Sequence, residues 1–162
     1  MENREESEVR KILSSVTDPE IPVLTIDDLG IIREINVSGK NVKVTITPTY
    51  SGCPAMDHIT SDIKLALAEA GYIPEVVSVL STAWSSLWIS ENGRKKMEAY
   101  GIAAPLEATA DKKALIGGQK IVKCTRCGSI NTRLISQFGS TACKALFQCN
   151  DCLEPFDYFK CI

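Results

Sequence analysis

The sequence predicts an α+β protein in which a small domain, with helices over one face of a short sheet, precedes a small β module built around a metal ion. Two observations predict this. Helical and strand periodicities over residues 1–111 follow the order helix, strand, strand, helix, strand, helix. Two Cys-x-x-Cys pairs then lie within residues 121–162. We place the domains at these two ranges, joined by a linker at residues 112–120.

Length and charge support two units. A chain of 162 residues allows one ordinary domain or two small ones, and 44% hydrophobic residues are enough for a packed core. Residues 1–111 carry 10 Lys and Arg against 17 Asp and Glu, a net charge of −7, whereas residues 112–162 carry 8 against 3, a net charge of +5. The linker combines Gly117 and Gly118 with a charge cluster and has no regular periodicity. We therefore expect two units with different tasks.

The first three elements are a helix and a hairpin. Four apolar side chains share one face of a helix, which ends before two prolines: Val9, Ile12, Leu13 and Val16, then Pro19 and Pro22. Residues 31–37 and 42–46 alternate apolar and polar side chains on either side of Ser38-Gly-Lys-Asn. This pattern predicts a half-buried β-hairpin.

A helix, a strand and a second helix complete the first domain. Apolar side chains from Pro54 to Ala70 trace one helical face, and Gly71 follows as the stop signal. Residues 75–81 read as a third strand. Ser90 can cap a further helix that reaches about Tyr100, because its hydroxyl accepts a hydrogen bond from a free amide there.

The two Cys-x-x-Cys pairs predict a metal site with the spacing of a zinc ribbon. Twenty-one residues separate the pairs, and strand-like stretches at 131–138 and 145–148 can form a hairpin that brings the pairs together. The predicted zinc ligands are Cys124, Cys127, Cys149 and Cys152. An iron ion or iron–sulfur cluster on the same thiolates, and free buried thiols, stay open as alternatives. Two further cysteines, Cys143 and Cys161, are possible additional ligands that lack a Cys-x-x-Cys partner.

A seventh cysteine, Cys53, precedes the long helix of the first domain. Free amides and the positive end of the helix dipole would lower its pKa and make it a nucleophile or a soft-metal ligand. The alternative is a small residue in a tight turn. Asp18 and Glu20 lie in a proline-stiffened turn that could hold a metal or cap a helix. The single His58 lies about 140° around the helix from Cys53, which disfavours a Cys–His dyad.

Several function classes are disfavoured. We find no apolar run long enough to span a membrane and no leader-like segment, so we expect a cytoplasmic protein with reduced thiols. Phosphate-binding, nucleophile-elbow and zinc-protease motifs are absent, and we expect no self-sufficient enzyme. Nucleic-acid binding by the basic module, with Phe147, Phe156, Tyr158 and Phe159 as stacking residues, is disfavoured because the module has no Lys/Arg run. Trp84 and Trp88 read as a packing face or an interface patch.

Three segments resemble the MIP18-like domain of iron–sulfur assembly factors, including the SufT type, over residues 8–83. They are Thr17-Asp-Pro-Glu-Ile-Pro, Asp28-Leu-Gly-Ile-Ile and Tyr50-Ser-Gly-Cys-Pro-Ala-Met. Four later segments are similar to PaaD-type subunits of the phenylacetyl-CoA ring epoxidase system, so that the resemblance covers nearly the whole chain. These are Trp84-Ser-Ser-Leu-Trp-Ile-Ser, Gly101-Ile-Ala-Ala-Pro, Phe138-Gly-Ser-Thr-Ala-Cys-Lys-Ala-Leu and Glu154-Pro-Phe-Asp-Tyr-Phe-Lys-Cys.

The resemblance implies an accessory, non-catalytic subunit in aerobic phenylacetate degradation. In that system a separate di-iron subunit epoxidises the ring and an iron–sulfur flavin reductase supplies electrons; these two are the implied protein partners. By analogy with the assembly factors, the chain would help to mature or insert an iron or iron–sulfur centre in a partner. The resemblance assigns Asp18, Glu20 and Cys53 to that role. A structural scaffold that docks the complex through its ribbon is the alternative.

Overall fold

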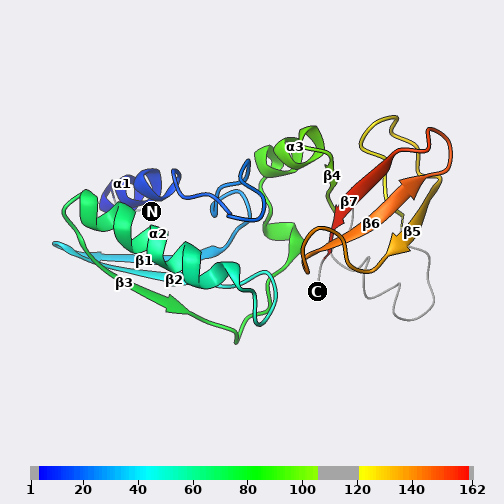
Figure 1. The fold of residues 1–162 in the computed structure, drawn as a ribbon. Helices are drawn as coiled ribbons and strands as arrows, with labels where there is room; N and C mark the ends of the chain where they lie inside the picture. Colours follow the sequence, from blue (N-terminus) through cyan, green and yellow to red (C-terminus); the bar gives the residue numbers. More distant parts are fainter. Residues whose placement is uncertain (1–3, 106–120, 161–162) are drawn as a thin grey trace. The chain divides into compact units, whose positions relative to one another are not determined.

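The computed structural model describes residues 4–105 and 121–160, and the chain divides into two compact units, 1–84 and 85–162 (Figure 1). The α+β class with a C-terminal β ribbon is confirmed. The predicted linker lies outside the described residues. The division differs from the predicted domain end at residue 111: β4 (Ile102–Ala103) pairs with β7 (Pro155–Phe159), so the last predicted helix and β4 group with the ribbon.

The N-terminal unit is a three-stranded sheet with two helices on one face (Figure 1). Its elements are α1 (Arg4–Leu13), β1 (Ile32–Ser38), β2 (Asn41–Ile46), α2 (Ala55–Glu69) and β3 (Ile73–Ser78). β1 and β2 form the predicted antiparallel hairpin, and β3 adds parallel to β2. The third strand thus begins two residues earlier than predicted and ends at Ser78.

The apolar faces predicted from periodicity form the core of this unit. Helix α2 packs against β3 and α1, and α1 packs against β1. Gly71 adopts φ +87°, a left-handed conformation that favours glycine, and its amide donates to the Ala68 carbonyl at the end of α2. The fully buried side chains include Val9, Leu13, Leu24, Ile26, Val44, Ile46, Ile59, Ile63 and Leu67.

The C-terminal unit combines a short helix with a four-stranded sheet in the order β4-β7-β6-β5. Before the sheet come the 3₁₀ turn η1 (Ser86–Trp88) and α3 (Glu91–Ala99). The predicted cap of α3 is confirmed, because the Ser90 hydroxyl accepts from the Gly93 amide at 2.9 Å. β5 (Thr132–Ser136) and β6 (Lys144–Cys149) form the predicted hairpin, and β6 also pairs antiparallel with β7.

Four aromatic side chains of the ribbon are buried, which argues further against the stacking role that the sequence already disfavoured. Phe147 contacts Phe156 and Tyr158, with ring centroids 6.2 and 5.4 Å apart. These three and Phe159 are each at most 4% exposed. They cannot stack on nucleic-acid bases while the unit is folded.

Candidate functional site

Four cysteines come together at one end of the ribbon. Cys124 and Cys127 lie on a turn in which the Gly128 amide donates to the Cys124 carbonyl at 3.0 Å. Cys149 ends β6, and Cys152 follows on the next turn. The four sulfurs all lie within 4.8 Å of one another, and the pairs Cys124–Cys152 and Cys127–Cys149 are 3.6 Å apart. The structure thus brings together the four predicted ligands.

This geometry fits a tetrahedral zinc ion. With Zn–S bonds of about 2.3 Å, the edges of an S₄ tetrahedron measure about 3.8 Å. Backbone amides of Arg126 and Cys152 donate to the sulfurs of Cys124 and Cys149 at 3.4 and 3.5 Å, which stabilises thiolates. Four soft sulfur donors without a carboxylate or histidine suit zinc, and also suit iron.

A polar network ties the two cysteine turns together. The Asp151 carboxylate accepts hydrogen bonds from the Ser129 hydroxyl and, at 2.8 Å, from the Asn131 amide. Ser129 and Asn131 hold the pKa of the Asp151 carboxyl below its ordinary value through these bonds. Asn150 donates to the Asn131 side-chain oxygen at 3.0 Å. Asp151 belongs to the Cys149–Cys152 turn, and Ser129 follows the Cys124–Cys127 turn. The network therefore fixes the distance between the two cysteine turns.

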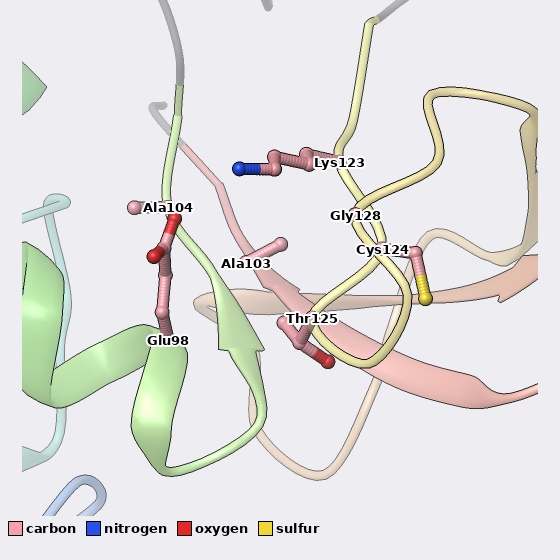
Figure 2. Close-up of a pocket in the computed structure, with 7 residues that line it drawn as sticks. All are labelled: Glu98, Ala103, Ala104, Lys123, Cys124, Thr125 and Gly128. Carbon is pink, nitrogen blue, oxygen red and sulfur yellow. The ribbon is translucent and has the colours of Figure 1, made fainter.

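A pocket of about 120 Å³ flanks the first cysteine turn (Figure 2). Its lining comes from α3, β4 and the Cys124 turn, and consists of Glu98, Ala103, Ala104, Lys123, Cys124, Thr125 and Gly128. Figure 2 shows the Cys124 sulfur pointing away from the Lys123 ammonium group.

The remaining ribbon cysteines differ from the cluster. Cys143 is 4% exposed, and its sulfur lies 3.0 Å from the Thr141 hydroxyl. Within the described residues 4–105 and 121–160, the cluster of four sulfurs does not include Cys143. Cys161 lies outside the described residues.

Cys53 lies in the loop between β2 and α2, where Gly52 permits the turn. Gly52 has φ +77°, a conformation that strains other residues. Pro54, expected at the first helical position, takes the N-cap position instead, and α2 begins one residue later at Ala55. The Cys53 side chain is half-buried. This loop places the thiol beside the first turn of α2, as the sequence predicts.

The electrostatics of Cys53 differ from the prediction of a lowered pKa. Burial raises the pKa of the Cys53 thiol above its ordinary value. A hydrogen bond from the Ala55 backbone amide lowers the pKa, which is the predicted effect of the helix start, and a hydrogen bond with the Tyr50 side chain lowers it too. The negative charges of Glu20 and Asp18 raise it further, and the net direction is upward. The prediction was wrong because it considered only the helix and not the loops around it.

The structure brings Asp18 and Glu20 into electrostatic range of Cys53, but the two carboxylates differ. Asp18 is 8% exposed, and its Oδ1 accepts from the backbone amides of Glu20 and Ile21 at 2.7 and 2.9 Å. It therefore caps a turn of the loop that follows α1, and not a helix as one of the two predicted roles had it. Within the described part of the chain, these three groups do not form a preformed cluster of ligand atoms. His58 lies exposed on α2.

Replacing Glu20 with Gln is expected to speed alkylation of Cys53. The change removes a negative charge that disfavours the thiolate, so a larger thiolate fraction is present at a given pH. Iodoacetamide labelling between about pH 7 and 9, read at the Cys53 peptide by mass spectrometry, measures the rate. Glu8→Gln, an exposed change on α1, is the control. A rate unchanged by Glu20→Gln would contradict the electrostatic role of Glu20.

Sequence reasoning missed the buried polar contacts of the N-terminal unit. The Trp84 indole N–H donates to the Leu29 carbonyl at 2.8 Å, across 55 residues of chain. Asp28, 7% exposed, accepts from the Thr25 amide at 3.2 Å. The Thr47 hydroxyl is buried and has no hydrogen-bond partner among the described residues. No local pattern in the sequence indicates these contacts.

Comparison with known proteins matches two segments of the chain to family models and nearly the whole chain to one relative. The family described as the PaaD zinc beta ribbon domain matches residues 108–160, and the family described as iron-sulfur cluster assembly protein matches residues 6–81. Over 156 residues the chain is 46% identical to an Escherichia coli (strain K12) protein named as a subunit of a "Putative 1,2-phenylacetyl-CoA epoxidase", covering 96% of this chain and 92% of that protein. The chain belongs to the PaaD family.

Two other relatives match part of this PaaD-family chain. An "Fe-S protein maturation auxiliary factor" of Porphyromonas gingivalis (strain ATCC BAA-308 / W83) is 41% identical over 61 residues, which cover 37% of this chain and 57% of that protein. The crystal structure of a domain of unknown function, DUF59, from Bacillus anthracis is 28% identical with a TM-score of 0.54, covering 57% of this chain and 90% of that chain. The resemblance to both families is thereby confirmed.

Proposed function

We propose that this chain is an accessory, non-catalytic subunit of the phenylacetyl-CoA epoxidase system that assists maturation or insertion of an iron or iron–sulfur centre in a partner subunit. One observation carries the proposal: a single chain joins an iron–sulfur assembly domain at 6–81 to a PaaD zinc ribbon at 108–160. The proposed partners are the di-iron catalytic subunit or the iron–sulfur reductase. The proposed place of action is the cytoplasm, where thiols stay reduced.

In this proposal the ribbon holds a structural zinc ion through Cys124, Cys127, Cys149 and Cys152. When bound, the ion cross-links the two cysteine turns and supplies folding free energy. The buried core of the ribbon and the Asp151 network then hold the turns in place. No step of the transfer passes through the zinc ion.

Cys53 is the proposed transfer residue, with the iron species as its cargo. A thiol with a raised pKa stays protonated at neutral pH, and it releases its proton to solvent when it coordinates the cargo. Competition from that proton weakens the resting hold on the metal, which suits temporary binding and handover. Glu20 lies near enough to interact electrostatically with the bound cation, and Asp18 holds the turn that carries Glu20.

The second candidate is a scaffold whose ribbon docks the complex without any transfer. Exposed apolar side chains on the C-terminal unit favour it, among them Leu87, Ile130, Phe138 and Leu153 at 66–70% exposure. If the chain is a scaffold, its association with the complex requires the four ribbon cysteines. Substitution of Cys53 should then have no effect on the complex. Nucleic-acid binding is not favoured, because four ribbon aromatics, Phe147, Phe156, Tyr158 and Phe159, are buried.

Cys53→Ser is expected to abolish iron loading of the partner while leaving the fold intact. The serine oxygen is a poor ligand for iron compared with a thiolate, and the half-buried site tolerates its smaller size. Epoxidase subunits are co-expressed with the wild type or the variant, and their iron content and visible spectra are measured after purification.

Two controls separate transfer from docking. Ser51→Ala changes the same loop at an exposed position and keeps the thiol, so it should support normal iron loading. Co-purification of Cys53→Ser with the partner shows that docking persists. Normal partner iron in Cys53→Ser would overturn the transfer role and support the scaffold.

A further inference from the structure

Strand β5 forms the edge of the ribbon sheet, and no strand of residues 4–105 or 121–160 pairs with its outer side. Unpaired backbone groups at such an edge can accept another strand. β5 contains neither proline nor lysine, but it is short and carries Arg133 and a bulge, which restrict pairing to a short segment. Within the described residues, this edge is therefore open to pairing by a short extended segment.

The side chains along this edge are apolar and exposed. The β5 edge surface is defined here as Ile130, Arg133, Leu134, Ile135 and Phe138. Its four apolar members are 43–70% exposed. Leu134 lies opposite the buried Phe147 in the β5–β6 register, so the apolar core face continues to the open edge.

The charge beside this surface is positive. Arg133 lies opposite Gln148 and donates to its neutral side-chain oxygen at 2.6 Å. The Lys160 ammonium group lies 4.6 Å from the centre of the Phe138 ring. Two carboxylates also lie near this edge: Glu154 is paired with Arg126 at 2.9 Å, and Asp151 accepts hydrogen bonds from Ser129 and Asn131. A partner with negative charge complements this edge.

We propose that the β5 edge surface binds an extended segment of a partner protein in which apolar side chains alternate with Asp or Glu. Successive side chains of a strand point to opposite faces, and cross-strand neighbours share a face. A segment added beside β5 thus presents its acidic side chains on the face of Arg133 and its apolar side chains on the face of Leu134. A second copy of this chain fits less well, because its β5 carries the same positive charge.

The bulge in β5 limits the length of this pairing. The β5–β6 register shifts between Leu134 and Ser136, which leaves Ile135 as the extra residue. We expect backbone pairing with the segment at residues 132–134. Ile135 and Phe138 would contact the segment through their side chains only. A short recognition segment of about six to eight residues spans this surface.

The test uses the full, zinc-loaded chain and two labelled octapeptides, one alternating Val with Glu and one alternating Val with Lys. Fluorescence anisotropy measures their affinities, and amide NMR shifts locate the contact. The acidic peptide should bind the wild type more tightly than the basic one, with shift changes concentrated at residues 130–138. Arg133→Glu should weaken the acidic peptide about threefold to tenfold and strengthen the basic one.

Two further variants test the apolar contact. Leu134→Ser should also weaken the acidic peptide, whereas Leu65→Ser, a change of the same kind at an exposed position of α2, should not. Zinc content and circular dichroism confirm that each variant is folded. Equal affinity for both peptides, shift changes away from β5, or self-association of the chain through β5 in sedimentation experiments would each overturn the proposal.

Discussion

Cys149→Ser is expected to unfold the C-terminal unit and to abolish zinc binding. Cys149 is fully buried, ends the central strand β6, and provides one of the four sulfurs. A structural zinc site contributes on the order of 10 kcal/mol of folding free energy. This is comparable with the whole stability of a small domain, about 5–15 kcal/mol, so the ribbon should not survive the loss.

Zinc analysis by mass spectrometry and amide NMR spectra measure the two effects. The expected result is loss of bound zinc and collapse of the signals of residues 121–160, with the signals of the N-terminal unit preserved, because that unit has its own core. A strong chelator added to the wild type should give the same spectrum.

Cys143→Ser is the matched control. Cys143 is also buried, but its sulfur contacts the Thr141 hydroxyl, a contact that a serine hydroxyl can keep. This variant should retain one zinc ion per chain. A folded ribbon with stoichiometric zinc in Cys149→Ser, or loss of zinc in Cys143→Ser, would contradict the assignment of the four ligands.

The fold was predictable where the information is local. The helical face of α2 and the alternation in β1 and β2 specify their elements, because burial of one face selects the period of 3.6 or 2. Strand β4 contains only two residues and exists because it pairs with β7, more than 50 residues later. No periodicity can indicate so short an element, and the grouping of α3 and β4 with the ribbon therefore had no local signal in the sequence.

The candidate site shows the same division between local and distant information. Paired cysteines predicted the ribbon cluster, because each pair needs only one turn to place two sulfurs. The pKa of Cys53 depends on burial and on carboxylates at positions 18 and 20, more than 30 residues away. A helix start can stabilise a thiolate, but here the surrounding groups outweigh it.

Solvent exposure of the aromatic residues also required the three-dimensional structure. Phe156 and Tyr158 alternate with other residues in β7, and the sequence alone did not indicate which face is covered. Pairing with β6 places both rings against Phe147. These buried rings are therefore not available for stacking on single-stranded nucleic acids, and Phe138 is the exposed phenylalanine of the described ribbon residues 121–160.

Trp84→Ala is expected to destabilise the N-terminal unit by about 3–5 kcal/mol, the usual cost of truncating a buried Trp. Trp84 is 5% exposed, and its indole N–H donates to the carbonyl of the fully buried Leu29. The change leaves a cavity and removes the hydrogen bond from that carbonyl. Urea denaturation followed by far-ultraviolet circular dichroism measures the free energy of unfolding.

Trp84→Phe separates packing from hydrogen bonding. It keeps much of the ring but leaves the Leu29 carbonyl without the indole donor, so we expect a smaller loss of about 1–3 kcal/mol. Leu87→Ala, at a side chain that is 70% exposed, should change stability by less than about 0.5 kcal/mol. If Trp84→Ala were as stable as the wild type, Trp84 would not be a packing residue. If Trp84→Ala were destabilised but Trp84→Phe were as stable as the wild type, packing alone would account for the contribution of Trp84. Its hydrogen bond to Leu29 would then contribute nothing measurable.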